Sequence, residues 1–110
     1  MAYSSRFQES AALELERIVA TLASYSEQAA STLLDHLDSQ LDLICSGIVS
    51  YGLSRMPELA RLGYHCALLG DYLFLYYIEG GEVVVAHVFH QRQDYAALVR
   101  SQKETEGQNP

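Results

Sequence analysis

Lysine and tryptophan are the residues that this sequence most plainly lacks. The 110 residues contain one lysine, Lys103, and no tryptophan, and seven basic residues stand against fourteen acidic ones for a net charge of −7. The excess of acidic over basic residues is largest in residues 1–50, which contain two arginines and seven acidic residues (−5). Residues 51–100 contain four arginines and five acidic residues (−1). Because proteins bind nucleic acids largely by neutralising phosphates with basic side chains, this shortage argues against broad binding of RNA or DNA.

Cysteine and long apolar runs are scarce as well. The two cysteines, Cys45 and Cys66, show no spacing typical of zinc ligands, so we expect reduced, buried thiols and no metal or other cofactor. No apolar run approaches the ~20 residues of a membrane helix. The N-terminal MAYSSRFQES has neither the basic nor the apolar region of a secretion signal. We therefore expect a cytoplasmic protein with no membrane partner.

Two amphipathic helices are predicted in the first half of the chain, which suits a single domain over residues 1–100 with a polar, flexible tail at 101–110. A short strand, Ala2–Phe7, precedes a helix at Ser10–Ser24 and a longer one at Ser26–Ser50. Apolar residues recur at helical spacing in both, which predicts an antiparallel hairpin joined near Tyr25. In the first helix they are Leu15, Ile18, Val19 and Leu22, and in the second Leu34, Leu37, Leu41, Ile44 and Ile48.

The second half of the chain predicts strands. Tyr64–Leu69, Tyr72–Ile78 and Glu82–His90 are apolar runs joined by two-residue turns that contain glycine, a strong signal for β-hairpins. The loop before them has one expected helical turn after Pro57, and Asp94 is expected to cap a short last helix. The predicted fold is therefore α+β, in the order β-α-α-β-β-β.

One chemical possibility is a metal-free ribonuclease, which needs a base, an acid and cations to stabilise a crowded phosphate. The side chains that could fill these roles, if they converge, are His65, His87, His90, Arg92, Tyr72 and Tyr76. The alternative is that His87 is a hydrogen-bonded core histidine and that His90 and Arg92 mark the end of a strand. Because His87 and His90 are three residues apart on a strand, they should point to opposite faces and make a poor metal pair.

Several short motifs occur in an order that resembles the RelE/ParE superfamily, the toxins of bacterial type II toxin–antitoxin (plasmid stabilisation) systems. The resemblance covers about residues 2–99. It rests on the acid-bearing helix FQESAALELERI, the loop Pro57–Arg61, and the strand that begins Gly70-Asp71-Tyr72 and contains Tyr76. It rests also on the Val-rich strand that leads to His90, Arg92 and Asp94.

Departures from that pattern indicate the subfamily. RelE-like ribonucleases commonly carry an arginine where this chain has Leu73, and basic residues on the preceding strand where it has Tyr64, His65 and Cys66. ParE-like members lack the cleavage residues and act by binding DNA gyrase. The resemblance therefore implies a ParE-like toxin with a cognate antitoxin partner. Its expected target-binding residues are Arg61, His90, Arg92, Asp94 and Tyr95.

Two alternatives stay open at this point. One is a RelE-like endoribonuclease that acts on ribosome-bound mRNA, and the other is an inactive homologue that serves as a binding module. A homo- or hetero-oligomer is compatible with each of them.

Overall fold

The computed structural model describes residues 3–47 and 57–92, in which three helices and four strands are formed. In chain order they are β1 (Ser4–Phe7), α1 (Glu9–Ala23), α2 (Glu27–Ser46), α3 (Pro57–Arg61), β2 (His65–Leu69), β3 (Tyr72–Glu79) and β4 (Glu82–His90). This order confirms the α+β class and the β-α-α-β-β-β sequence, with α3 as the helical turn expected after Pro57. The last helix expected after Asp94 and the tail at 101–110 lie outside the described residues. None of the described helices is long and apolar enough to cross a membrane.

The four strands form one sheet in the order β1-β4-β3-β2. Strands β2, β3 and β4 are an antiparallel meander, whereas β1 runs parallel to β4 and pairs with it only from Ser4↔Glu82 to Phe7↔Val85. Gly80 and Gly81 both have positive φ (57° and 80°), as the common two-residue hairpin turn requires. Strand β1 therefore lies beside the first half of β4, and no other described strand lies beside the second half of β4 on that side.

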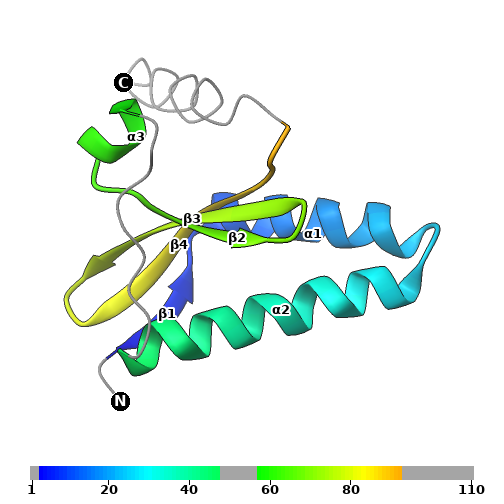
Figure 1. Ribbon diagram of the computed structural model, residues 1–110, viewed down its shortest axis with the longest axis horizontal. Helices are drawn as coiled ribbons and strands as arrows, with labels where there is room; N and C mark the ends of the chain where they lie inside the picture. The colour runs from blue at the N-terminus through cyan, green and yellow to red at the C-terminus, as the bar shows by residue number, and fades with distance from the viewer. Residues whose placement is uncertain (1–2, 48–56, 93–110) are drawn as a thin grey trace.

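Helices α1 and α2 form the predicted antiparallel hairpin (Figure 1). The Ser26 side chain begins α2 by accepting a hydrogen bond from the Ala29 N–H (3.1 Å), as an N-cap serine should. The helix ends at Ser46, earlier than the predicted Ser50, because Gly47 adopts the left-handed conformation (φ 83°) of a helix C-cap.

The prediction of the apolar stripe on α2 is wrong at one residue. Leu37, Leu41 and Ile44 are buried as expected, but Leu34 is 37 % exposed and Leu33 takes its place in the core. Both leucines have helical spacing from Leu37, four residues for Leu33 and three for Leu34, so periodicity alone could not choose between them. Ile48 lies outside the described residues.

The sheet has a core on each face. On the face that α1 and α2 cover, called here the helix face, the buried strand residues are Ala67, Leu69, Phe74, Tyr76, Val83, Val85 and Val88. On the second face they are Leu73, Leu75, Ala86 and Phe89, which pack with Leu59 and Tyr64. Strand β4 is buried from Val83 to Phe89, which confirms that a nearly continuous apolar run marks a strand covered on both sides.

Candidate functional site

His87 is a buried histidine on the second face of the sheet. It pairs with Leu75 across β3, has 4 % of its surface exposed, and lies edge-on to the Tyr64 ring at 6.3 Å. Its Nδ1 atom is 3.2 and 3.1 Å from the two carboxylate oxygens of Glu14 on α1. A buried polar ring needs such a partner, since an unpaired one would cost free energy.

Glu14 also fills a gap in the sheet, a role that the sequence did not reveal. Beyond the end of β1, the Gln8 N–H donates to the Val85 carbonyl (2.9 Å) and the Ser10 hydroxyl donates to the Ala86 carbonyl (2.7 Å). The Val88 N–H donates to Glu14 Oε1 (3.0 Å). Side chains of α1 thus replace the missing strand along β4, beside the register shift that leaves Ala86 unpaired. The available signal was the spacing of Ser10 and Glu14, four residues apart and therefore on one face of a helix.

His90 lies at the end of β4, on the helix face, and is partly exposed. Its ring meets the Tyr72 ring of β3 edge-on, with centroids 5.0 Å apart, and its Nδ1 accepts a hydrogen bond from the backbone N–H of the exposed Arg92 (3.0 Å). The Gln91 N–H donates to the Asp71 carbonyl (2.8 Å), which fixes this end of the chain against the β2–β3 turn. Tyr72, His90 and Arg92 are therefore brought together.

His65 and Tyr76 form a second, separate pair. They face each other across β2 and β3, and their rings stack with centroids 5.1 Å apart and planes 19° apart. Tyr76 is only 1 % exposed and belongs to the helix-face core. Because Tyr72 and Tyr76 are four residues apart on one strand, the two pairs are separated by roughly 13 Å. The buried Phe74 lies between them on the same face.

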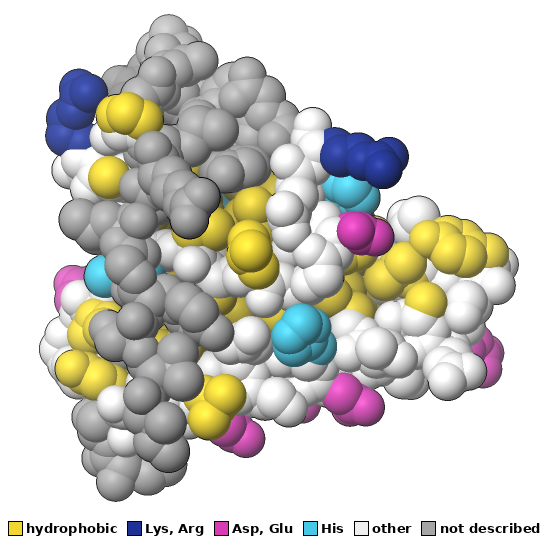
Figure 2. All heavy atoms as spheres, in the orientation of Figure 1, with side chains coloured by type: hydrophobic (Ala, Val, Ile, Leu, Met, Phe, Trp, Pro, Cys, Tyr) yellow, Lys and Arg dark blue, Asp and Glu magenta, His cyan; other side chains and the backbone are white. Residues whose placement is uncertain are grey.

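Six residues that the sequence singled out as one catalytic set are therefore in three places: the Tyr72–His90–Arg92 end, the His65–Tyr76 stack and the buried His87. Arg61 is exposed at the end of α3. Asp94 and Tyr95 lie outside the described residues. On the face drawn in Figure 2, lysine and arginine side chains are few and lie apart, so the described residues there form no continuous basic patch.

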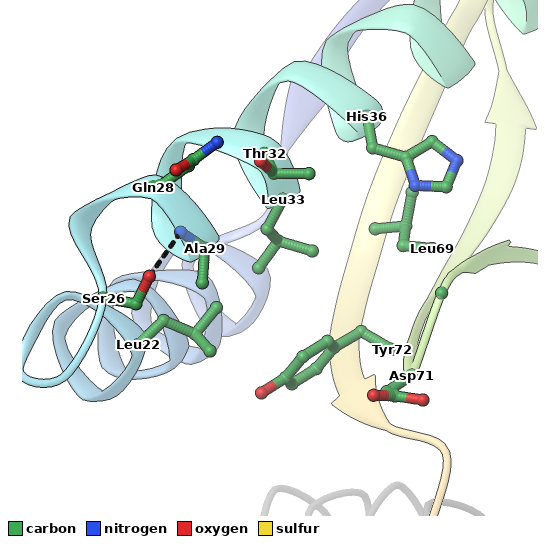
Figure 3. Close-up of a pocket in the computed structure, with 11 residues that line it drawn as sticks. Leu22, Ser26, Gln28, Ala29, Thr32, Leu33, His36, Leu69, Asp71 and Tyr72 are labelled. Carbon is green, nitrogen blue, oxygen red and sulfur yellow. Dashed lines mark hydrogen bonds between the residues drawn. The ribbon is translucent and has the colours of Figure 1, made fainter.

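A cleft of about 500 Å³ opens between the helical hairpin and the β2–β3 turn. Leu22, Leu33 and Leu69 supply apolar lining, and Asp71, Tyr72 and His36 supply polar groups. Figure 3 shows the Tyr72 ring extending from the sheet toward Leu22 of α1, with Asp71 next to it. Partial burial raises the pKa of the Tyr72 phenol, and the nearby Tyr25 and Asp71 raise it further.

Metal and thiol chemistry find little support in the part of the chain that the structure describes. No three histidine, cysteine, aspartate or glutamate side chains among residues 3–47 and 57–92 are grouped so that they could hold a metal ion. Both cysteines are free thiols; Cys45 is buried as expected, whereas Cys66 is only half-buried. Burial raises the pKa of the Cys66 thiol, which favours its protonated form.

Two solved structures share this arrangement of helices and strands. One, titled "Chromosomal ParDE TA system from P. aeruginosa", has a TM-score of 0.62 at 14 % identity, over 81 % of this chain and 96 % of that one. The other is a toxin–antitoxin complex, RelBE2 from Mycobacterium tuberculosis, with a TM-score of 0.53 at 25 % identity, over 82 % and 99 %. No curated protein matches the chain significantly in sequence.

The fold is thus that of the RelE/ParE superfamily of toxins, as the sequence motifs indicated. The family described as "ParE toxin of type II toxin-antitoxin system, parDE" matches residues 6–95. Because this match spans most of the chain, the chain belongs to the ParE toxin family.

Proposed function

We infer that this toxin arrests bacterial growth by binding a protein target, DNA gyrase, without cleaving RNA. The observation that carries this proposal is the separation of the six ribonuclease candidates. General acid–base cleavage needs its proton donor and acceptor within hydrogen-bond reach of one substrate. His87 is instead buried and bonded to Glu14 on the second face, and Tyr76 is closed off in the helix-face core.

Electrostatics supports the same proposal. A toxin that cleaves mRNA on the ribosome has to approach a dense array of phosphates, and a chain with a net charge of −7 is repelled by them. A protein target requires no such basic surface. One observation still favours the alternative, a ribonuclease that uses the six candidate residues: the Tyr72 ring contacts the His90 ring, and His90 is bonded to the backbone of Arg92.

The target contacts are proposed for the end of β4 and the end of α3. Arg92 and Arg61 are exposed arginines, and arginine is enriched where protein interfaces concentrate their binding energy. His90 positions Arg92 by accepting its backbone N–H. Asp94 and Tyr95, the next two residues of the motif, complete the proposed contact set.

The proposed antitoxin binds the helical hairpin. An apolar groove of about 520 Å³ follows α1, lined mainly by Phe7, Leu15, Val19 and Leu34. The half of the chain that carries it has a charge of −5, so a partner segment that presents an apolar stripe with flanking basic residues would fit. Of the two solved structures described above, one is titled a TA system and the other a toxin–antitoxin complex, which supports a partner of this kind.

The first test is induction of the chain alone in a bacterial culture, followed by two readouts. Growth arrest together with inhibition of gyrase supercoiling by the purified chain would support the proposal. New RNA 5′ ends within translated messages would support the ribonuclease instead. Normal growth with soluble protein present would contradict an active toxin and favour the inactive binding module. For a variant of the proposed contact set, such as Arg92→Ala, Arg6→Ala is a suitable control, because Arg6 is an exposed arginine that pairs with Glu82 at the far end of the sheet.

A further inference from the structure

The cleft in Figure 3 has the composition of a site for a cation with an apolar stem. Among the residues that the structure describes, its lining includes one carboxylate, that of Asp71, and no lysine or arginine. Within the described residues Asp71 has no ion-pair partner, since the pairs found there are Arg6–Glu82 and His87–Glu14. Asp71 would therefore repel an anionic ligand, whereas a cation would gain a partner in its carboxylate.

Two further features of the cleft narrow the range of cations that would fit it. The Tyr72 ring faces the cleft and offers an aromatic surface, on which guanidinium groups stack well. Leu22, Leu33 and Leu69 offer apolar surface along which the methylene stem of a long basic side chain can lie.

We propose that this cleft binds an arginine side chain presented by a protein partner, with the guanidinium held between the Asp71 carboxylate and the Tyr72 ring. Arginine suits it better than lysine because its planar group both stacks on a ring and forms paired hydrogen bonds to a carboxylate. The volume, about 500 Å³, exceeds one side chain, so the cleft also accommodates residues that flank the arginine. The inference does not depend on which macromolecule the toxin inhibits.

The test is a titration of the isotope-labelled full chain with acetyl-arginine methylamide, followed by NMR chemical shifts. Acetyl-citrulline methylamide is the matched probe, because citrulline has nearly the same shape but no charge. We expect saturable shifts around residues 22–36 and 69–72, with citrulline bound at least about fivefold more weakly. The lysine analogue should also bind more weakly than the arginine analogue.

Two variants place the site. Asp71→Asn removes an ion-pair partner, and should weaken arginine binding up to about fivefold and leave citrulline binding unchanged. Glu79→Gln is the control, because Glu79 is an exposed acid at the opposite end of β3 and should not matter. Equal binding of arginine and citrulline, an Asp71→Asn variant that behaves like Glu79→Gln, or shifts confined to other parts of the chain would each overturn the proposal.

Discussion

His87 and His90 are the same residue type on the same strand, three residues apart, and the protein uses them in opposite ways. His87 lies in the middle of β4, where both faces are covered, and its ring is fixed by Glu14. His90 lies where the strand ends, partly exposed, against Tyr72 and next to Arg92. Helix α1 contacts the strand beside His87, where Ser10 bonds to Ala86 and Glu14 bonds to His87 and Val88. The interior of β4 is thus closed off from solvent, and its end is partly exposed.

The largest expected effect on stability comes from a similar contrast on α2, between a buried leucine and an exposed one. Leu41→Asp places a charge among buried side chains and should unfold the chain, with a loss of more than about 4 kcal/mol. Leu34→Asp, on the exposed rim of the same helix, should cost less than about 1 kcal/mol. Urea unfolding followed by circular dichroism measures both. Equal losses would contradict the assignment of Leu33, rather than Leu34, to the core.

Glu14→Ala tests the interior of β4. The substitution leaves the His87 ring and the Val88 N–H without their partner, and should lower the free energy of unfolding by about 2–3 kcal/mol. Glu14→Gln keeps an oxygen for the Val88 N–H and should lose only about 1 kcal/mol.

The matched control is Glu16→Ala, since Glu16 is exposed on the same helix and should change stability by less than about 0.5 kcal/mol. If Glu14→Ala and Glu16→Ala are equally stable in urea, the contact with β4 contributes nothing and the comparison between the two histidines fails.

Arg92→Ala tests the end of β4. Arg92 is exposed, so its removal should change the free energy of unfolding by less than about 0.5 kcal/mol while abolishing growth arrest. The measurement is growth after induction, with equal amounts of soluble protein verified for each variant. Arrest that survives Arg92→Ala, or a variant that no longer folds, would move Arg92 from target binding to a structural role.

The smallest effect on stability is expected at alkaline pH, where Tyr72 ionises. The pKa of Tyr72 in the folded chain is raised above its usual 10.0, so the unfolded chain loses this proton first as the pH rises. The folded state is therefore favoured fully below about pH 10 and loses that advantage as the pH rises through the folded-state pKa.

Tyr72→Phe removes this titration, and its urea stability should fall less than that of the parent between about pH 9 and about pH 11. Tyr3→Phe is the control, because Tyr3 precedes β1 at the opposite end of the sheet from the β2–β3 turn. Identical pH profiles for Tyr72→Phe and the parent would show that Tyr72 is as free to ionise in the folded chain as in the unfolded one.

The fold followed from the sequence because its signals are local. Apolar spacing defined α1 and α2, and Gly70-Asp71 and Gly80-Gly81 placed both hairpins. The ambiguity between Leu33 and Leu34 was not local, since it depends on how α2 is rotated against the sheet. The Glu14–His87 contact joins residues 73 positions apart, and nothing in either segment announces the other. The cleft beside Tyr72 likewise exists only when α1, α2 and the β2–β3 turn meet.

The side chains of Ser10 and Glu14 also have a protective consequence. The segment from Val83 to Phe89 is rich in β-branched residues and carries no acidic, lysine or arginine side chain, the composition from which intermolecular β-aggregates grow. Strand β1 covers only its first half, and the remaining backbone groups would offer a template for another copy of the chain. By bonding to Ala86 and Val88, α1 occupies two of these backbone groups and makes this edge a poor place for another copy of the chain to pair.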